Sequence, residues 1–387
     1  MPTLKANRFV PQKPSSPGEL SCNVALLTLP SAIQMTSLQA NRTRIASARL
    51  ALLFCVFFLI ACGLGYPILN RFDPRQTPGL SDVKIYASLV TGTASPDAGY
   101  VRFRVLVPWL AKPFYRLAQG RFATWDPVMF GLLIADALFV AGTTVLIVIL
   151  GGILEASFGN RQMDGSAAGL VGALLYMVNF AVPNLRLVGL VDAGEGFFLL
   201  ALLWSLSEFE LWALPVIAVL GALTKESFIP FSIVFTTAWW FSTRPDRNSD
   251  DARNHFVPAA VWILTSWVLS FTAIMVLQWS ITGRLISPLQ FGLALHRGDG
   301  FHFAVSLHDR NLWYIFLWLL PTAMPDLKRF PKSWLIPVGA TCATAFVLDA
   351  YFGGPPAAGS AWGRALFSIA GPVLSLSSAL FLVRISS

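Results

Sequence analysis

Charged side chains interrupt otherwise apolar stretches of this sequence at a few places. Asp192 and Glu195 stand three residues apart in one apolar run, so on a helix they share a face. Lys225 and Glu226 lie in a short polar turn between two other apolar runs, and Arg364 precedes the last one. A charge at membrane depth costs about 2.5 to 3.5 kcal/mol on insertion scales, so these groups are expected to line one hydrated cavity.

Two interpretations of these residues stay open. Asp192 and Glu195 either contact a cation, a metal or an acceptor, or they pair with Arg186 or Lys225 and lock helices together. The turn that contains Lys225 is either part of a site or a solvated loop. Asp136 differs because it lies near the middle of an apolar run, where a protonated carboxyl or a hydrogen bond between helices is expected.

The segment 70–125 contains a second group of residues capable of chemistry. Ser81 is a helix-capping type, and Asp82 and Tyr86 then share a helical face at a spacing of four. Arg102 and Arg104 follow, at the start of an amphipathic stretch. An acid and several cations are therefore expected near one another in this segment.

The amphipathic stretch is predicted to lie at a membrane surface. Lys112 and Arg116 continue a basic face at multiples of four from Arg104, while Pro108 and Pro113 predict a jointed helix. Such a stretch either anchors the chain at the interface or binds phosphate groups.

Composition sets the class of protein to which these residues belong. Hydrophobic residues make up 55% and charged residues 12% of the 387 positions, and the mean hydropathy is +0.63. Soluble proteins carry roughly 25% charged residues. The net charge of +8 is scattered over loops and termini, which argues against a nucleic acid partner and favours membrane lipids. The fold class is therefore predicted to be all-α, a polytopic transmembrane bundle.

The apolar runs predict ten spans in a single membrane domain, 46–387, after a disordered cytoplasmic tail, 1–45. The spans are Leu50–Leu69, Pro127–Leu150, Ala167–Val182, Leu187–Leu206, Leu211–Leu223, Phe228–Phe241, Val257–Trp279, Leu312–Met324, Trp334–Tyr351 and Ala365–Val383. The fifth and sixth are short and could instead form a re-entrant hairpin. With both termini in the cytoplasm, most loop cations lie inside, whereas the long loop 70–125 lies outside despite its many cations. Binding an anionic ligand would explain that exception.

No metal site is predicted. His296, His302 and His308 recur every six residues, so on a helix they face three directions, although on an extended strand they would share a face. The four cysteines show no CxxC spacing. The need for a cofactor stays open, a divalent cation included.

Taken together, these features resemble the GT-C superfamily of membrane glycosyltransferases, which use polyprenyl-phosphate sugars. The resemblance lies in the long outer loop after the first span, the acid near its start, the interfacial helix with arginines, the Thr-Lys-Glu turn, and the late arginine in Gly363–Phe367. It implies transfer of a sugar from a lipid-linked donor to a glycan or another acceptor on the outer face, in a bacterial inner membrane.

The resemblance also implies roles for individual residues. A carboxylate must take the proton of the acceptor hydroxyl, and cations must hold the phosphate leaving group. Asp82 is the expected base and Asp73 the reserve. The candidate binding residues are Tyr86, Arg102, Arg104, Asp192, Glu195, Lys225, Glu226 and Arg364. Two other classes stay open, a secondary transporter and a non-catalytic component of envelope-polysaccharide assembly.

Overall fold

All regular structure in the described residues is helical, as predicted. The computed structural model describes residues 32–71, 81–93, 99–122, 124–158, 165–243, 250–284, 310–352 and 362–386. The elements are α1 Ala32–Arg71, α2 Ser81–Thr91, η1 Gly99–Phe103, α3 Leu106–Ala118, α4 Pro127–Phe158, α5 Gly165–Val178, η2 Val182–Arg186, α6 Asp192–Ser207, α7 Ala213–Thr224, α8 Phe228–Ser242, α9 Asp250–Thr282, α12 Arg310–Phe316, α13 Leu319–Leu327, α14 Lys332–Phe352 and α15 Trp362–Ser386. The chain divides into two units, Met1–Arg49 and Leu50–Ser387, and the second contains all elements after α1.

Among the described residues, four helical segments are long and apolar enough to cross a membrane. They are Ser47–Leu69, Pro127–Glu155, Pro258–Thr282 and Gly363–Ser386, and each exceeds the roughly 20 residues that a crossing needs. Four shorter apolar helical segments accompany them, at Ala167–Val178, Ala213–Thr224, Phe228–Ser242 and Lys332–Leu348. These segments indicate a membrane protein, and four of the ten predicted spans reach crossing length in the described residues.

The predicted span Ala167–Val182 is shortened because Asn179 ends its helix. The side-chain oxygen of Asn179 accepts a hydrogen bond from the backbone N–H of Ala181 at 3.0 Å. Its side-chain nitrogen donates to the carbonyl of Ile315 at 3.1 Å. A side chain that bonds to nearby backbone competes with the helical pattern, so α5 stops one residue earlier and the short π-helical segment η2 follows.

Other boundaries also differ from the prediction. α6 begins at Asp192 rather than Leu187, because Gly189 between them has a φ of +77°, which a helix does not accommodate. The predicted span Leu312–Met324 is divided into α12 and α13. α1 begins within the segment 1–45, for which no regular structure is predicted.

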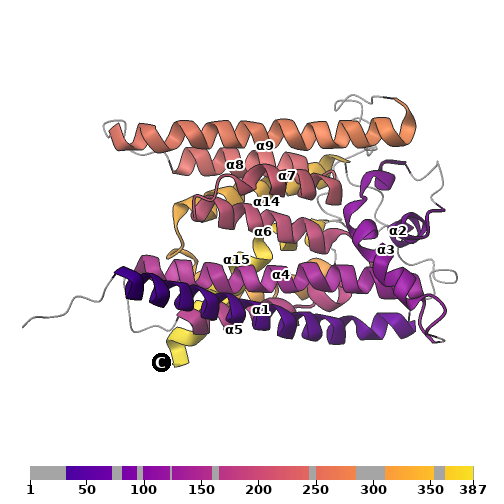
Figure 1. Ribbon diagram of the computed structural model, residues 1–387, viewed down its shortest axis with the longest axis horizontal. Coiled ribbons are helices and arrows are strands. Elements are labelled where there is room, and N and C mark those ends of the chain that lie inside the picture. The colour runs from indigo at the N-terminus through magenta and orange to yellow at the C-terminus, as the bar shows by residue number, and fades with distance from the viewer. Residues whose placement is uncertain are drawn as a thin grey trace, which may run out of the picture. The chain divides into compact units, whose positions relative to one another are not determined.

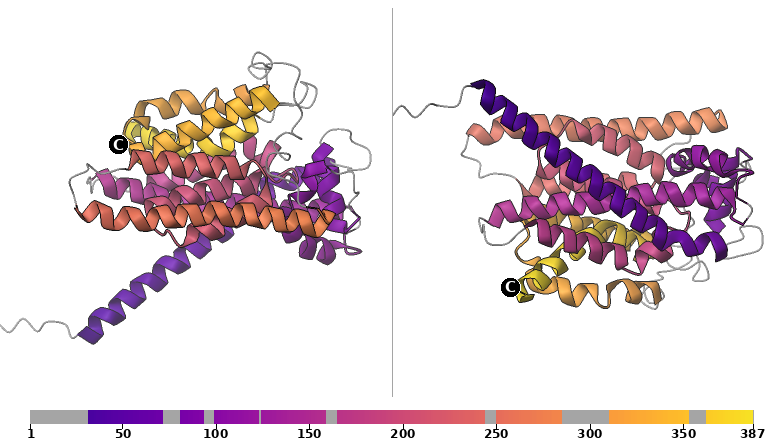
Figure 2. Two further views of the ribbon diagram at one scale, coloured as in Figure 1. Left: turned by 90° about the horizontal axis from the view of Figure 1, so that it is seen from above. Right: turned by 60° about the horizontal axis from the view of Figure 1, so that its bottom comes forward.

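The longer helices of the second unit lie alongside one another, with α2 and α3 together at one end of them (Figures 1 and 2). α4 packs against α3, α5 and α6, and α15 packs against α5, α6, α13 and α14. Gly151 permits the close approach of α4 and α5, since a Cβ there would lie 2.6 Å from the Cα of Gly169. α4, α6 and α15 therefore form a packed centre that brings distant segments of the chain together.

The amphipathic stretch forms one helix, α3, with Pro113 inside it, so the predicted joint is absent. Arg104 precedes α3 instead of lying on its basic face with Lys112 and Arg116. The side chain of Arg104 is buried. Its charge is therefore directed into the protein and not toward a lipid surface.

Asp136, for which a protonated carboxyl or a hydrogen bond between helices is predicted, bonds to a non-helical residue. An oxygen of its carboxyl group, fully buried in α4, accepts a hydrogen bond from the backbone N–H of Gly189 at 3.0 Å. This bond fixes the non-helical residues before α6, and α6 supplies the carboxylates described next.

Candidate ionic site

The first turn of α6 brings two buried carboxylates to one cation. Asp192 and Glu195 share a face of the helix, and Lys225 meets both: its Nζ lies 2.8 Å from an oxygen of Asp192 and 2.9 Å from an oxygen of Glu195. Lys225 follows the last residue of α7 in extended conformation, with φ −161° and ψ 137°. The hydroxyl of Ser227 donates to the other oxygen of Glu195. The polar turn between α7 and α8 is thus packed against α6.

The N-terminal turn of α15 contacts Asp192 from another direction. A guanidinium nitrogen of Arg364 lies 3.3 Å from the second carboxylate oxygen of Asp192. Arg364 uses one of its five N–H donors in this contact, and no other acceptor binds it among the described residues. About a fifth of its side chain, 21%, is exposed. Arg364 therefore retains donors that a ligand can reach.

A second cluster forms around Arg104. Its guanidinium makes a two-pronged ion pair with Glu226, with the Nε to oxygen distance at 2.7 Å. It also donates to the hydroxyl of Tyr86 at 2.8 Å and lies 3.3 Å from a carboxylate oxygen of Asp82. These bonds engage four donor positions of Arg104 and hold α2 against the α7–α8 turn.

Charge pairing shifts the titration of this second cluster. Burial alone would raise the pKa of Glu226, but the adjacent Arg104 guanidinium outweighs burial and holds it below its ordinary value. Burial would likewise lower the pKa of Arg104, and the charge of Glu226 reverses that effect and raises it. Burial raises the pKa of Tyr86, so its phenol stays protonated. At neutral pH Arg104 and Glu226 are therefore a charged pair, and Tyr86 is a neutral phenol.

The two clusters form one ionic site because Lys225 and Glu226 are consecutive residues. The site includes the carboxylates of Asp82, Asp192, Glu195 and Glu226 and the cations Arg104, Lys225 and Arg364. Its most exposed member is Asp82, with 36% of its side chain accessible. A ligand at this site therefore reaches Asp82 and Arg364 before the buried members.

Of the ten predicted site residues, these seven and Tyr86 come together. Arg102 is next to them in sequence, and its guanidinium lies over the ring of Phe103, 5.0 Å from the ring centre. Asp73, His296, His302 and His308 lie outside the described residues. Both interpretations of the α6 carboxylates remain compatible with the geometry, since Lys225 binds both of them and part of the site is exposed.

Arg186 contributes in a way that the sequence analysis missed. It is expected to pair with a carboxylate, but its guanidinium donates to the backbone carbonyl of Asp192. It also donates to the hydroxyl of Ser368 at 2.6 Å and lies over the ring of Phe367, 5.5 Å from its centre. Arg186 thus joins α6 to α15 and sets the spacing between Asp192 and Arg364. The sequence feature that could have indicated this role is the position of Arg186 as a single cation between apolar residues.

Glycines in α6 let these groups approach. A Cβ on Gly194 would lie 2.8 Å from a methyl carbon of Thr224, the last residue of α7. A Cβ on Gly196 would lie 2.8 Å from a guanidinium nitrogen of Arg186. Both distances are too short for real contacts, so a larger residue at either position would push α7 or Arg186 away from α6.

The site combines groups suited to acid–base chemistry and anion binding: an accessible carboxylate, an arginine with unused donors, and buried ion pairs that fix both. Within the described residues, no cluster of histidine, cysteine and acidic side chains is arranged to hold a metal ion. Comparison of the chain with protein-family models, curated proteins and solved structures found no match.

Proposed function

We propose that this protein is a membrane glycosyltransferase of GT-C type, which moves a sugar from a polyprenyl-phosphate donor to an acceptor on the outer face of a bacterial inner membrane. The observation that carries the proposal is that one ionic site contains both the accessible Asp82 carboxylate, which pairs with Arg104, and the partly exposed Arg364 guanidinium, which pairs with Asp192. Transfer from a phosphate-linked donor needs both a base for the acceptor and a cation for the leaving group.

Asp82 acts as the general base in this proposal. Its carboxylate is the most exposed of the site and is oriented by Arg104, which Glu226 in turn fixes. It takes the proton of the acceptor hydroxyl as the new glycosidic bond forms. Because Arg104 already donates to Glu226, Tyr86 and Asp82, it positions the base instead of binding phosphate.

Arg364 binds the phosphate that leaves with the lipid. As the bond from the sugar carbon to the phosphate oxygen breaks, negative charge grows on the phosphate, and the unused donors of Arg364 stabilise it. Lys225 has less freedom because two carboxylates already hold it. It supplies positive charge behind Asp192, and so keeps Arg364 available to the ligand.

The proposal includes a topology. Ten crossings with both termini in the cytoplasm put the ionic site at the outer surface, with the loop 70–125 beside it. Support comes from the four crossing-length helices and from the position of the site, where the first turns of α6 and α15 meet the α7–α8 turn. Cysteine accessibility labelling at Lys84→Cys from either side of sealed vesicles tests the orientation, and labelling from the cytoplasmic side alone contradicts it.

Release of polyprenyl phosphate tests the activity. The purified full chain is incubated with polyprenyl-phosphate hexoses and pentoses and with glycan acceptors. We expect release with at least one sugar, a loss of at least 100-fold in Asp82→Asn, consistent with the 10²–10⁴ that general bases contribute, and a similar loss in Arg364→Gln.

Two exposed residues away from the site provide matched controls. Glu208→Gln removes an exposed acid beyond the far end of α6, and Arg116→Gln removes an exposed cation of α3. Both variants should release lipid phosphate at the rate of the unmodified chain. Full activity in Asp82→Asn and Arg364→Gln would reject this site as the catalytic centre, and solute transport without sugar consumption would reject the enzyme.

A further inference from the structure

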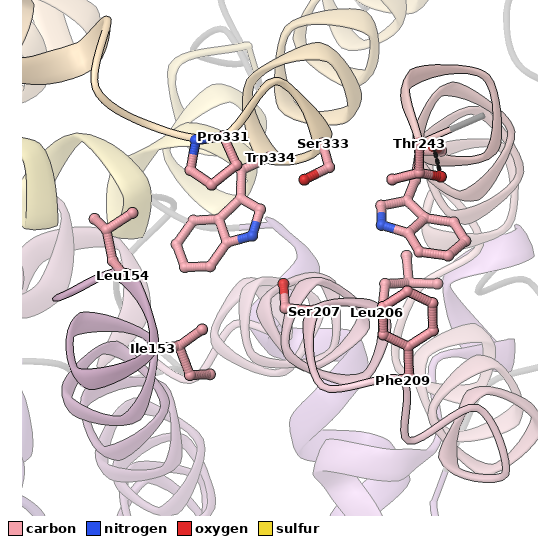
Figure 3. Close-up of a pocket in the computed structure, with 10 residues that line it drawn as sticks. Ile153, Leu154, Leu206, Ser207, Phe209, Thr243, Pro331, Ser333 and Trp334 are labelled. Carbon is pink, nitrogen blue, oxygen red and sulfur yellow. Dashed lines mark hydrogen bonds between the residues drawn. The ribbon is translucent and has the colours of Figure 1, made fainter. Parts of the chain in front are cut away.

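A cavity of about 200 Å³ opens at the far end of α6 from the ionic site. It lies where α4, α6 and α8 near their C-terminal ends and α14 begins. Apolar side chains form much of its wall, among them Leu154, Leu206 and Phe209 (Figure 3). From Asp192 to Leu206, α6 rises about 21 Å at 1.5 Å per residue, so the cavity is separate from the proposed catalytic centre.

Polar atoms point into this apolar space. The indole nitrogen of Trp334 and the hydroxyls of Ser207 and Ser333 are directed toward its middle (Figure 3). Trp334 is only 3% exposed, and among the described residues no acceptor binds its indole N–H. The hydroxyl of Ser207 donates to the carbonyl of Leu203 at 2.7 Å. The indole N–H of Trp334 is therefore a donor at the cavity wall to which a ligand can bond.

Trp239 repeats this situation in α8. It lines the same cavity, it is 2% exposed, and its indole N–H also has no acceptor among the described residues. Two indole side chains that line one largely apolar cavity favour a ligand that combines acceptor oxygens with hydrocarbon.

Positive charge surrounds the wall formed by α14. Lys332 is exposed and lies between Pro331 and Ser333, which both line the cavity, and Lys328 is exposed nearby in sequence. Arg329 and Arg384 share the buried carboxylate of Asp326, at 2.8 Å and 3.1 Å. The described residues here thus include two arginines paired with one acid and two exposed lysines close to the cavity lining in sequence, an excess of positive charge that favours an anionic ligand.

We propose that the cavity binds one anionic phospholipid. Its phosphate and ester oxygens accept hydrogen bonds from the indole N–H of Trp334 and the hydroxyl of Ser333, Lys332 neutralises the phosphate, and the start of an acyl chain lies against Leu154 and Phe209. Basic pockets between membrane helices bind anionic headgroups in this way. The site stabilises the junction of α4, α6, α8 and α14, and it does not depend on the proposed glycosyl transfer.

Native mass spectrometry of the full chain in detergent tests the proposal. Phosphatidylglycerol and phosphatidylcholine with the same acyl chains are added separately at equal concentration. We expect one molecule of phosphatidylglycerol to be retained per chain, with phosphatidylcholine retained at least tenfold less. Trp334→Phe keeps the ring and removes the donor, and should weaken phosphatidylglycerol binding about tenfold.

One control variant and one further variant make the result decisive. Trp279→Phe alters an exposed indole of α9 and should leave lipid retention unchanged. Lys332→Gln alters an exposed side chain, so it tests the charge even if Trp334→Phe fails to fold, and it should also weaken binding severalfold. Equal retention of the two lipids, retention unaffected in Lys332→Gln, or displacement of the lipid by millimolar inorganic phosphate would overturn the proposal.

Discussion

Replacing Lys225 by methionine should leave a buried charge without its cation. Lys225 is the only cation that the described structure places within ion-pair distance of Glu195, whose side chain is fully buried at 0% exposure. In Lys225→Met, Glu195 retains the hydroxyl of Ser227, while Asp192 retains Arg364. The two carboxylates are therefore affected unequally, and Glu195 carries most of the cost.

The expected loss of stability is large. Removing one partner of a buried ion pair costs about 3–5 kcal/mol. With about 2 °C per kcal/mol for a large chain, the midpoint of thermal unfolding falls by roughly 6–10 °C. The fraction of monodisperse protein after heating in detergent, followed by size-exclusion chromatography, measures this midpoint. The control is Lys112→Met on α3, because Lys112 forms no ion pair within the described part of the chain, and it should change the midpoint by less than about 2 °C.

A second substitution separates charge from packing. In Lys225→Met with Glu195→Gln, the side chain at position 195 is neutral, so most of the lost stability should return although two residues are changed. This non-additivity is the sign of a direct ion pair. Equal or greater damage in the double variant would show that Lys225 acts through packing, and that the electrostatic account of the site is wrong.

Three further predictions concern pH, α4 and the residues before α6. The pKa of Glu226 in the folded protein lies below its ordinary value, so the ion pair contributes its full stability above about pH 4.3, and this contribution is lost as the pH falls through the folded pKa. In Glu226→Gln, the free energy of unfolding should therefore fall less steeply with decreasing pH. Equal slopes for the two proteins would contradict this. Asp136→Asn keeps an acceptor for the N–H of Gly189 and should lower the free energy of unfolding by less than about 1 kcal/mol. Asp136→Leu removes the acceptor and should lower it by about 1–3 kcal/mol, as measured by chemical unfolding. Equal losses in the two variants would argue against the hydrogen bond. Gly189→Ala should lower the free energy of unfolding by about 1–2 kcal/mol, because position 189 has a φ of +77°. Gly152→Ala should show no such loss, because its new Cβ would meet open space.

The membership of the ionic site was more predictable than its pairing. The cost of an isolated charge among apolar residues is a local property, so Asp192, Glu195 and Lys225 could be assigned to one place from the sequence. Which cation meets which acid depends on segments far apart, as with Arg104 and Glu226, which are 122 positions apart. The contacts of Arg104 with Glu226, Tyr86 and Asp82 are the reason for proposing that it positions Asp82, in place of the phosphate binding expected from the sequence.

The helical class was predictable and the interruptions were not. Hydropathy reports the length of an apolar run, and it predicted α4 and α15 well. Hydropathy does not report where a single side chain ends a helix by competing for backbone hydrogen bonds, as Asn179 does at the end of α5. Nor does it report the backbone conformation of Gly189, which delays the start of α6 until Asp192 becomes its first residue.

The sequence Asp192-Ala193-Gly194-Glu195-Gly196 alternates acids with residues that have little or no side chain. A carboxylate can meet a partner on a neighbouring helix without intervening water only where the two backbones come close, and the missing Cβ atoms at 194 and 196 allow that. The same alternation at the beginning of an apolar helix offers a criterion for screening other membrane sequences, since it would distinguish acids committed to contacts between helices from acids that face open water.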